Sequence, residues 1–365
     1  MIIDIVKVFL PALGSFILGI LVTPILTNFL YSHKMWKKKS GKIALDGGEA
    51  KIFNELHKEK EVNTPRMGGV IIWFSSAIIT IGIWIISKIF PGDIIEKIDF
   101  LSRNQTWIPL ATLMLGALVG LVDDYLEIKP VFSKEGIEMH SKGGLSLKKR
   151  LLIVSIIALG CAWWFYVKLG VDSIGLPFAL GGGEFYLGPI FILLFLLTTL
   201  FIYAGGVIDG LDGLAGGVFT TMFAAYGGIA FYQQQINLAA FCTTVVGGLL
   251  AFLWFNLPPA RFYMSETGTM GLTITLTVIA FMTDRLGGGY GFLVLPIIAL
   301  PLVVTVLSNI LQVLSKKFRG KKIFLVAPLH HHFEAIGWPS YKVTMRYWII
   351  SVVCAILGIT LALIG

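Results

Sequence analysis

Two adjacent aspartates close an apolar run in this sequence, and such a pair is suited to metal or proton chemistry. The run extends from Trp107 to Val122 and is followed directly by Asp123 and Asp124. Neighbouring carboxylates repel each other, and at a helix C-terminus they also oppose the macrodipole. A close carboxylate pair can hold Mg²⁺, or one acid can take a proton while the other keeps its charge. The alternative interpretation is an ordinary helix end at a membrane interface.

A second acidic pair lies in the glycine-rich stretch 203-YAGGVIDGLDGLAGG-217, where Asp209 and Asp212 are three residues apart. Glycine allows a sharp turn and a close approach of the backbone to a ligand. The helix expected after this turn would present free N–H groups that could face an anion. Packing of small residues between helices would explain the glycines but not the acids.

A further acid and a histidine run complete the polar set. Glu266 lies in 254-WFNLPPARFYMSETGTMG-271, and an acid favouring the helix dipole is its simpler interpretation. The three histidines at 330–332 are consecutive, so they cannot all face one metal from a regular helix or strand. A pH-dependent or phosphate-facing role is expected for them, and a hydrogen-bonded loop residue is the alternative. The chain has no GxxxxGK[ST] motif, which excludes a P-loop nucleoside triphosphatase.

The elements that must position these residues are membrane helices. Of the 365 residues, 56% are hydrophobic and 14% charged, whereas a soluble domain has about 25% charged residues. Recurring apolar runs predict an all-α polytopic membrane protein that forms one domain over 1–365. Cys161, Cys242 and Cys354 fall in such runs and are expected to be packing residues. We expect ten transmembrane helices, at roughly 8–31, 67–89, 106–122, 150–168, 189–207, 213–232, 238–255, 268–283, 291–314 and 344–364.

The distribution of charge predicts the orientation. Most of the 29 lysine and arginine residues fall in the loops at about 32–66, 123–149, 208–212, 256–267 and 315–343. The positive-inside rule makes these loops cytoplasmic and puts both termini on the extracytoplasmic side. The same loops carry the unusual acids and histidines, which predicts one cytoplasmic site. Topology and anionic headgroups account for most of the basic residues, and nothing requires nucleic acid. The charged segment 31–66 is a candidate surface helix, from which Lys58 or Lys60 could reach a nucleotide.

Five segments together resemble one enzyme family. They are TPRMGG (64–69), GLVDDY (120–125), IDGLDGLAGG (208–217), FLWFN (252–256) and RGKKIFLVAPLHHHFEAIGWP (319–339). They resemble the phospho-N-acetylmuramoyl-pentapeptide transferases, or translocase I, of the polyprenyl-phosphate N-acetylhexosamine-1-phosphate transferase superfamily. The resemblance implies a bacterial inner-membrane enzyme that transfers phospho-N-acetylmuramoyl-pentapeptide from its UDP-linked donor to undecaprenyl phosphate. Lipid I and UMP would be the products, Mg²⁺ the cofactor and a homodimer the assembly.

The resemblance also implies residue roles. One acid of the first pair, with Asp123 favoured, would deprotonate or orient the lipid phosphate. Tyr263 would stack on uracil, and Lys142 would bind phosphate. The implied catalytic and metal-binding acids are Asp123, Asp124, Asp209 and Glu266. The implied substrate-binding residues are Thr64, Lys142, Asp212, Asn256, Tyr263, His330, His331 and His332.

Four positions depart from the family pattern. Glu266 stands where an aspartate metal ligand is usual, and it reaches one methylene further. Gly206 replaces an asparagine, Glu127 a lysine, and Thr305 an acid. The DD, DGLDG and HHH motifs are intact, so we expect a working but divergent enzyme.

Two other functions remain as alternatives. A sister transferase that uses UDP-N-acetylglucosamine or another UDP-sugar is the nearer one, although the APLHHHFE segment favours the peptidoglycan branch. A transporter would distribute its acids through the membrane depth and show a pseudo-repeat, and this sequence has neither feature. Direct attack and a covalent phospho-enzyme are both compatible with the residues.

Overall fold

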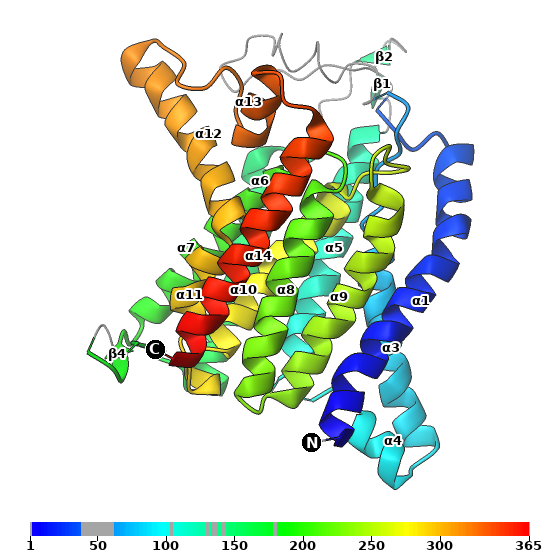
Figure 1. The fold of residues 1–365 in the computed structure, drawn as a ribbon, viewed down its shortest axis with the longest axis vertical. Coiled ribbons are helices and arrows are strands. Elements are labelled where there is room, and N and C mark those ends of the chain that lie inside the picture. The colour runs from blue at the N-terminus through cyan, green and yellow to red at the C-terminus, as the bar shows by residue number, and fades with distance from the viewer. Residues whose placement is uncertain are drawn as a thin grey trace.

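The computed structural model describes residues 2–37, 62–102, 105–128, 131–132, 138–139, 144–177 and 181–364. In these residues the chain is a bundle of long helices that run roughly side by side, as Figure 1 shows. The prediction of an all-α polytopic membrane protein is confirmed, since nine helices of the described chain are long and apolar enough to span a membrane. Helices suit these apolar runs because they satisfy every backbone group internally. Lys58, Lys60 and Lys142 lie outside the described residues.

The helices follow one another with short connections. They are α1 (Ile2–Ser32), α3 (Val70–Ile89), α4 (Asp93–Ile98), α5 (Trp107–Ile128), α6 (Leu147–Trp163) with a π-helical end (Trp164–Lys168), α7 (Ile190–Ala204) with a 3₁₀ turn (Gly205–Ile208), α8 (Leu214–Tyr232), α9 (Ile236–Asn256), α10 (Ser265–Met282), α11 (Gly291–Ile298), α12 (Leu300–Arg319), α13 (Leu329–Ala335) and α14 (Ser340–Ile364). Two antiparallel hairpins pair β1 (Val131–Phe132) with β2 (Glu138–Met139) and β3 (Ser173–Gly175) with β4 (Glu184–Tyr186).

Helix α10 lies inside the bundle and corresponds to the eighth predicted span. Every residue from Thr267 to Met282 is buried, yet five threonines make this helix too polar to count among the nine apolar ones. Its hydroxyls find partners within the protein, as in the 3.1 Å contact between Thr275 and Thr112 of α5. Its far end packs on aromatic rings, with Phe281 centred 4.7 Å from Phe195. Because α10 faces protein rather than lipid, it can carry polar groups.

Glycines bring α5 and α10 into backbone contact. A Cβ atom on Gly116 would lie 2.8 Å from the Cα of Gly271, and one on Gly120 would lie 2.0 Å from the carbonyl oxygen of Glu266. Real Cβ atoms do not approach other atoms so closely, so α5 needs glycine at both positions. This contact fixes the end of α5 beside the beginning of α10.

Two predicted boundaries were wrong. The predicted cytoplasmic loop at about 123–149 was expected to begin at Asp123, but α5 continues to Ile128, so both aspartates are helical. Their carboxylates have partners within the protein, described below, and therefore do not end the helix. The ninth span was expected to be continuous over 291–314, but it breaks between α11 and α12, close to Pro296 and Pro301. Proline removes a backbone donor and bends a helix, and α12 leans outward from the bundle in Figure 1.

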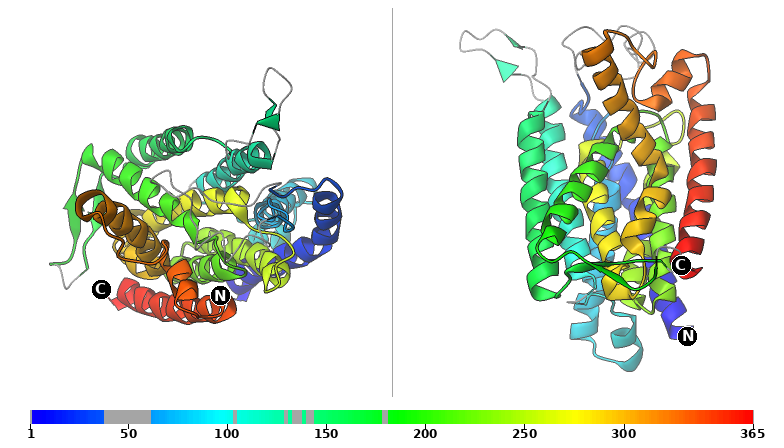
Figure 2. Two further views of the ribbon diagram at one scale, coloured as in Figure 1. Left: turned by 90° about the horizontal axis from the view of Figure 1, so that it is seen from above. Right: turned by 90° about the vertical axis from the view of Figure 1, so that its left-hand side faces the viewer.

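The two termini lie at one end of the bundle, opposite α13, as Figure 1 and the right-hand view of Figure 2 show. The β3–β4 hairpin lies toward the same end and is fastened by Asp284. The Asp284 carboxylate accepts hydrogen bonds from the backbone N–H groups of Gly175 at 2.7 Å and Phe292 at 2.9 Å. Burial raises the pKa of Asp284 to about 6, while these backbone donors favour the ionised form. Asp284 therefore joins the β3–β4 hairpin to the beginning of α11.

The glycine contact of α5 predicts the effect of a single methyl group. Gly120→Ala should lower the free energy of unfolding by about 1–3 kcal/mol, because the new Cβ collides with the backbone at Glu266. Gly160→Ala in α6 is the matched control, since nothing lies within 4 Å of its added Cβ. The thermal unfolding midpoint in detergent measures both. Equal midpoints for the two variants would contradict the close packing.

Candidate active site

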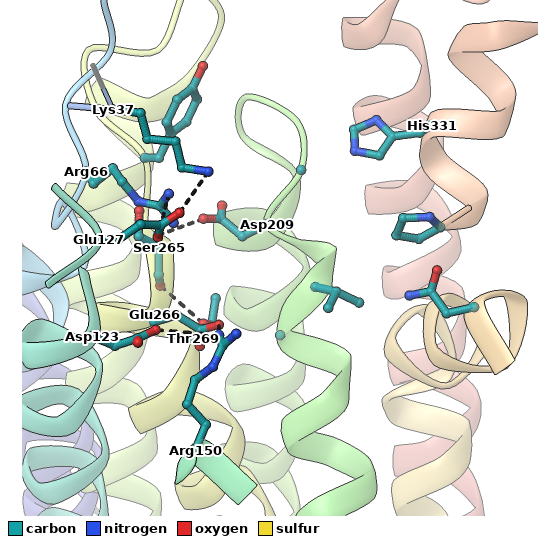
Figure 3. A pocket seen from close by; sticks show the side chains of 16 residues that line it. Lys37, Arg66, Asp123, Glu127, Arg150, Asp209, Ser265, Glu266, Thr269 and His331 are labelled. Atoms are coloured by element: carbon teal, nitrogen blue, oxygen red, sulfur yellow. Dashed lines mark hydrogen bonds and ion pairs between the residues drawn. The ribbon is translucent and has the colours of Figure 1, made fainter. Parts of the chain in front are cut away.

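A cavity of about 380 Å³ lies toward the α13 end of the bundle. Figure 3 shows its side chains, which come from α5, α6, α10, α12, α13, the turn after α7 and the loops beside α1, α3, α10 and α13. Of the described residues, four carboxylates and three basic side chains line it: Asp123, Glu127, Asp209, Glu266, Lys37, Arg66 and Arg150. The other lining residues are Gly206, Val207, Gly210, Tyr263, Ser265, Thr269, Asn309, Pro328 and His331. Residues from distant parts of the sequence thus form one charged chamber.

Asp123 and Glu266 share one arginine. Nη1 of Arg150 lies 2.6 Å from Oε1 of Glu266 and 3.5 Å from Oδ2 of Asp123. The other oxygen of Asp123 accepts a hydrogen bond from the backbone N–H of Leu145. Glu266 occupies the first turn of α10, and Arg150 the first turn of α6. Two carboxylates from different helices are therefore held together by a guanidinium from a third.

Asp124 faces a different direction from its neighbour. Successive side chains on an α-helix point about 100° apart, and Asp124 is fully buried outside the cavity lining. Its Oδ2 accepts hydrogen bonds from the backbone N–H of Thr267 at 2.9 Å and from the Thr267 hydroxyl at 2.6 Å. Its Oδ1 lies 3.3 Å from Nε of Arg66. The structure therefore separates the aspartate pair into one acid at the cavity and one inside the protein.

Glu127 connects two basic side chains on one wall of the cavity. Its carboxylate lies 2.8 Å from Nη1 of Arg66 and 2.8 Å from Nζ of Lys37. Burial alone would lower the pKa of the Arg66 guanidinium, but Glu127 and Asp124 together raise that pKa above its ordinary value. Arg66 is therefore a permanent cation. At position 127, where the resemblance predicts a lysine, the glutamate lies beside two cations from other segments.

Hydrogen bonds connect the DGLDG turn to the end of α9 and to the segment that leads into α10. Oδ2 of Asp209 accepts a hydrogen bond from the backbone N–H of Ser265 at 2.7 Å. Asn256 joins two loops: its amide oxygen accepts from the Gly213 N–H at 2.9 Å, and its NH₂ donates to the Phe262 carbonyl at 2.8 Å. Asp212 accepts a longer bond, 3.3 Å, from the N–H of Ala260. Of these acids and amides only Asp209 lines the cavity, so Asp212 and Asn256 hold the surrounding loops.

The three histidines have three different surroundings on α13. His331 lines the cavity, across from Asp123 in Figure 3, and its Nδ1 lies 2.8 Å from Oε2 of Glu334. His330 is fully buried, with its ring centre 4.3 Å from that of His331. His332 accepts a hydrogen bond at Nδ1 from the backbone N–H of Leu325.

Gly210 allows the histidines and the DGLDG turn to meet. A Cβ on Gly210 would lie 2.4 Å from Nε2 of His330 and 2.7 Å from Nε2 of His331. Any side chain at this position would push the α13 histidines away from the turn. The motifs DGLDG and HHH, more than 100 residues apart, thus depend on one glycine for their contact.

The remaining predicted positions have mixed locations. Tyr263 lines the cavity and Thr64 does not. Gly206 also lines it, and a Cβ there would meet Thr269 at 3.3 Å, so little space is free for the family's asparagine. Thr305 is buried outside the cavity lining and donates its hydroxyl to the carbonyl of Pro301 at 2.7 Å.

Sequence reasoning missed three basic residues of the cavity. Lys37, Arg66 and Arg150 were counted only as topology signals. Arg66 had a usable signal, because it lies within the TPRMGG motif. Lys37 and Arg150 had none, since many other basic residues share their loops.

A helical membrane bundle whose end cavity combines acids, basic side chains and a histidine is suited to chemistry on phosphate groups at a membrane. Residues 106–284 match the family model described as Glycosyl transferase family 4. The chain is 32% identical to a phospho-N-acetylmuramoyl-pentapeptide-transferase of Chloroflexus aggregans, over 99% of this chain and 91% of that protein. It is 30% identical to the protein of the same name from Lactobacillus acidophilus and 32% identical to the one from Bacillus velezensis, each over 94% of both chains. The chain therefore belongs to the phospho-N-acetylmuramoyl-pentapeptide-transferase family, a family of multi-pass bacterial membrane proteins.

The cation–glutamate contacts predict a charge-reversal result. Glu127→Lys should lower the thermal unfolding midpoint, because it places a third cation against Lys37 and Arg66. Adding Lys37→Glu reverses one ion pair and should recover part of that loss, with a coupling free energy of about 1 kcal/mol. The double-mutant cycle is measured by unfolding in detergent. A double variant no more stable than Glu127→Lys alone would show that the 37–127 contact contributes nothing.

Proposed function

We propose that this chain transfers phospho-N-acetylmuramoyl-pentapeptide from its UDP-linked donor to undecaprenyl phosphate, forming lipid I and UMP. The relatives' names give the transferred group and the class of reaction. The observation that carries the proposal is the convergence of Asp123, Asp209, Glu266 and His331 on one cavity from four separate segments. We place the reaction on the cytoplasmic face of the bacterial inner membrane, because the cavity lining includes Lys37 and Arg66, which belong to a loop that the positive-inside rule predicts to be cytoplasmic.

The charge balance of the cavity supports a role for Mg²⁺. Among the described lining residues, four carboxylates outnumber three basic side chains, and the two phosphate-containing substrates would add more negative charge. Mg²⁺ is usually held by one or two carboxylates together with substrate phosphates. No three acids, cysteines or histidines of the described residues are placed to hold one metal ion by themselves, so the proposal requires phosphate oxygens of the substrates to complete the coordination.

We assign the metal-holding role to Asp123 and Glu266, with Asp209 on the neighbouring wall. Their oxygen donors are the type that Mg²⁺ prefers, and all three line the cavity. Bound here, the ion would neutralise the charge of the diphosphate. Asp124 is not assigned to the metal, because it is buried outside the cavity lining, where Thr267 binds one of its oxygens and the Arg66 guanidinium lies near the other.

The proposed reaction exchanges one phosphoanhydride bond for another. An oxygen of the lipid phosphate bonds to the β-phosphorus of the donor, the bond from that phosphorus to the bridging oxygen breaks, and UMP leaves. Asp123 is the acid of the pair that can meet the lipid phosphate, to accept its proton or orient it. Arg66, Lys37 and His331 are available for phosphate oxygens, and Tyr263 for the uracil ring. Asp124 acts as a positioning residue that joins α5 to α10.

A UMP-release assay tests the proposed function. Purified full-length protein with Mg²⁺ and undecaprenyl phosphate should release UMP from the muramoyl-pentapeptide nucleotide, and much less from UDP-N-acetylglucosamine. Asp123→Asn serves as the background control and should reduce turnover by orders of magnitude, because it removes the carboxylate that faces the lipid phosphate. A preference for UDP-N-acetylglucosamine would favour the sister transferase. No UMP from either donor, in a sample with a sharp unfolding transition, would rule out both.

The UMP-release rate should depend on the charge of the side chain at position 266 more than on its length. Glu266→Asp keeps the carboxylate and should retain a substantial fraction of the UMP-release rate. Glu266→Gln has nearly the same shape but no charge, so its rate should fall by about a hundredfold, a loss in the range of one removed charge-stabilising group. Raising the Mg²⁺ concentration should rescue the aspartate variant better than the glutamine variant. A fully active glutamine variant would exclude Glu266 as a metal ligand.

A further inference from the structure

Arg150 occupies the space between the two carboxylates that we assign to the metal. It contacts Glu266 at 2.6 Å and Asp123 at 3.5 Å, and Figure 3 shows its guanidinium beside both acids. Its side chain is 25% exposed and lines the cavity, so solvent and ligands reach it. A metal cation and this guanidinium would neutralise the same pair of charges.

The two acids depend on Arg150 to different degrees. Asp123 is also fixed by the backbone N–H of Leu145, which can hold its carboxylate without the arginine. Among the described residues, the Glu266 carboxylate has one further hydrogen bond, from the Thr269 hydroxyl at 3.4 Å, which is a weak one. The guanidinium is therefore the principal partner of Glu266.

The second arginine of the cavity provides a contrast. Arg66 pairs with Glu127 and with the buried Asp124, whose carboxylate is also bound by Thr267. Neither acid is assigned to the metal, so a bound metal ion would not compete with Arg66 for its carboxylate partners. Arg150 alone among the described basic residues of the cavity is bonded to acids of the proposed metal set.

We propose that Arg150 is a displaceable internal counter-ion that competes with the divalent cation for Asp123 and Glu266. Before the cation binds, the guanidinium holds the two carboxylates together and limits their repulsion. When the cation binds, the guanidinium is released and can turn its N–H donors toward phosphate oxygens, for which its fork geometry is suited. The extra methylene of Glu266 fits this arrangement, because it extends the carboxylate to the guanidinium. The inference rests on the proposed function, since it takes its metal site from there.

Manganese binding to the full-length protein tests the competition without any substrate. Mn²⁺ titration in detergent, followed by electron paramagnetic resonance, gives the dissociation constant of the ion. Arg150→Gln should lower that constant by about fivefold, because a partly exposed ion pair is worth about 1 kcal/mol. The same variant should release UMP more slowly, since it has lost a phosphate-binding cation. Tighter metal binding together with slower turnover is a combination that loss of structure does not produce.

Two variants serve as controls. Arg150→Lys keeps the cation and should bind Mn²⁺ about as wild type does. Lys149→Gln removes the same charge from an exposed neighbour outside the cavity lining and should leave the Mn²⁺ constant unchanged. Unchanged or weaker Mn²⁺ binding by Arg150→Gln would overturn the inference, as would the absence of Mn²⁺ binding by all four proteins. UMP release by wild-type protein, measured separately, decides the proposed function whichever way the Mn²⁺ result falls.

Discussion

The structure depends on one electrostatic constraint: carboxylates that lie within a bundle of membrane helices must have fixed partners. An unpaired buried charge costs several kcal/mol, and only good geometry with additional hydrogen bonds offsets that cost. Each acid at the cavity end of the bundle meets this requirement in its own way. Asp124 uses Thr267 and Arg66, whereas Asp209 uses the backbone N–H of Ser265. The beginning of α10 supplies partners to both, and this explains why a polar helix occupies the interior.

Such partnerships require the backbones to approach closely, and glycine provides the space. The Thr267 N–H can reach Asp124 because Gly120 lets α5 lie directly against the backbone of Glu266. Gly210 has the same effect for the DGLDG turn and His331. Electrostatics and packing are therefore coupled here: a methyl group added at either glycine would separate charged groups from their partners as well as crowd the core.

The sequence predicted the membrane helices well because their apolar runs have a length fixed by the bilayer. It was less successful at the ends of helices, where local partners decide the outcome. Asp123 and Asp124 looked like a helix end because charge is costly in lipid, but the protein neutralises both and α5 continues. The break between α11 and α12 was also missed, although Pro296 and Pro301 were signals for it in the sequence.

The acids and histidines of the cavity could be nominated from the sequence because few such residues occur near apolar runs. The basic partners could not, because a loop with many lysines and arginines does not reveal which one contacts an acid. Thr267 and Asp124 are 143 residues apart, and Arg150 and Glu266 are 116 apart. Contacts of that separation follow from how the helices pack, and a single sequence does not encode them in any local pattern.

The two acidic departures from the family pattern have a common physical explanation. Glu127 adds a negative charge where a lysine is usual, and Arg66 and Lys37 lie beside it. Glu266 extends a carboxylate by one methylene, and Arg150 receives it. In both places the acid of this chain is matched by a cation from a distant segment, so the local charge is balanced. Such matching is what a functioning site needs in order to diverge, because an unmatched change at either position would leave a charge without a partner within the bundle.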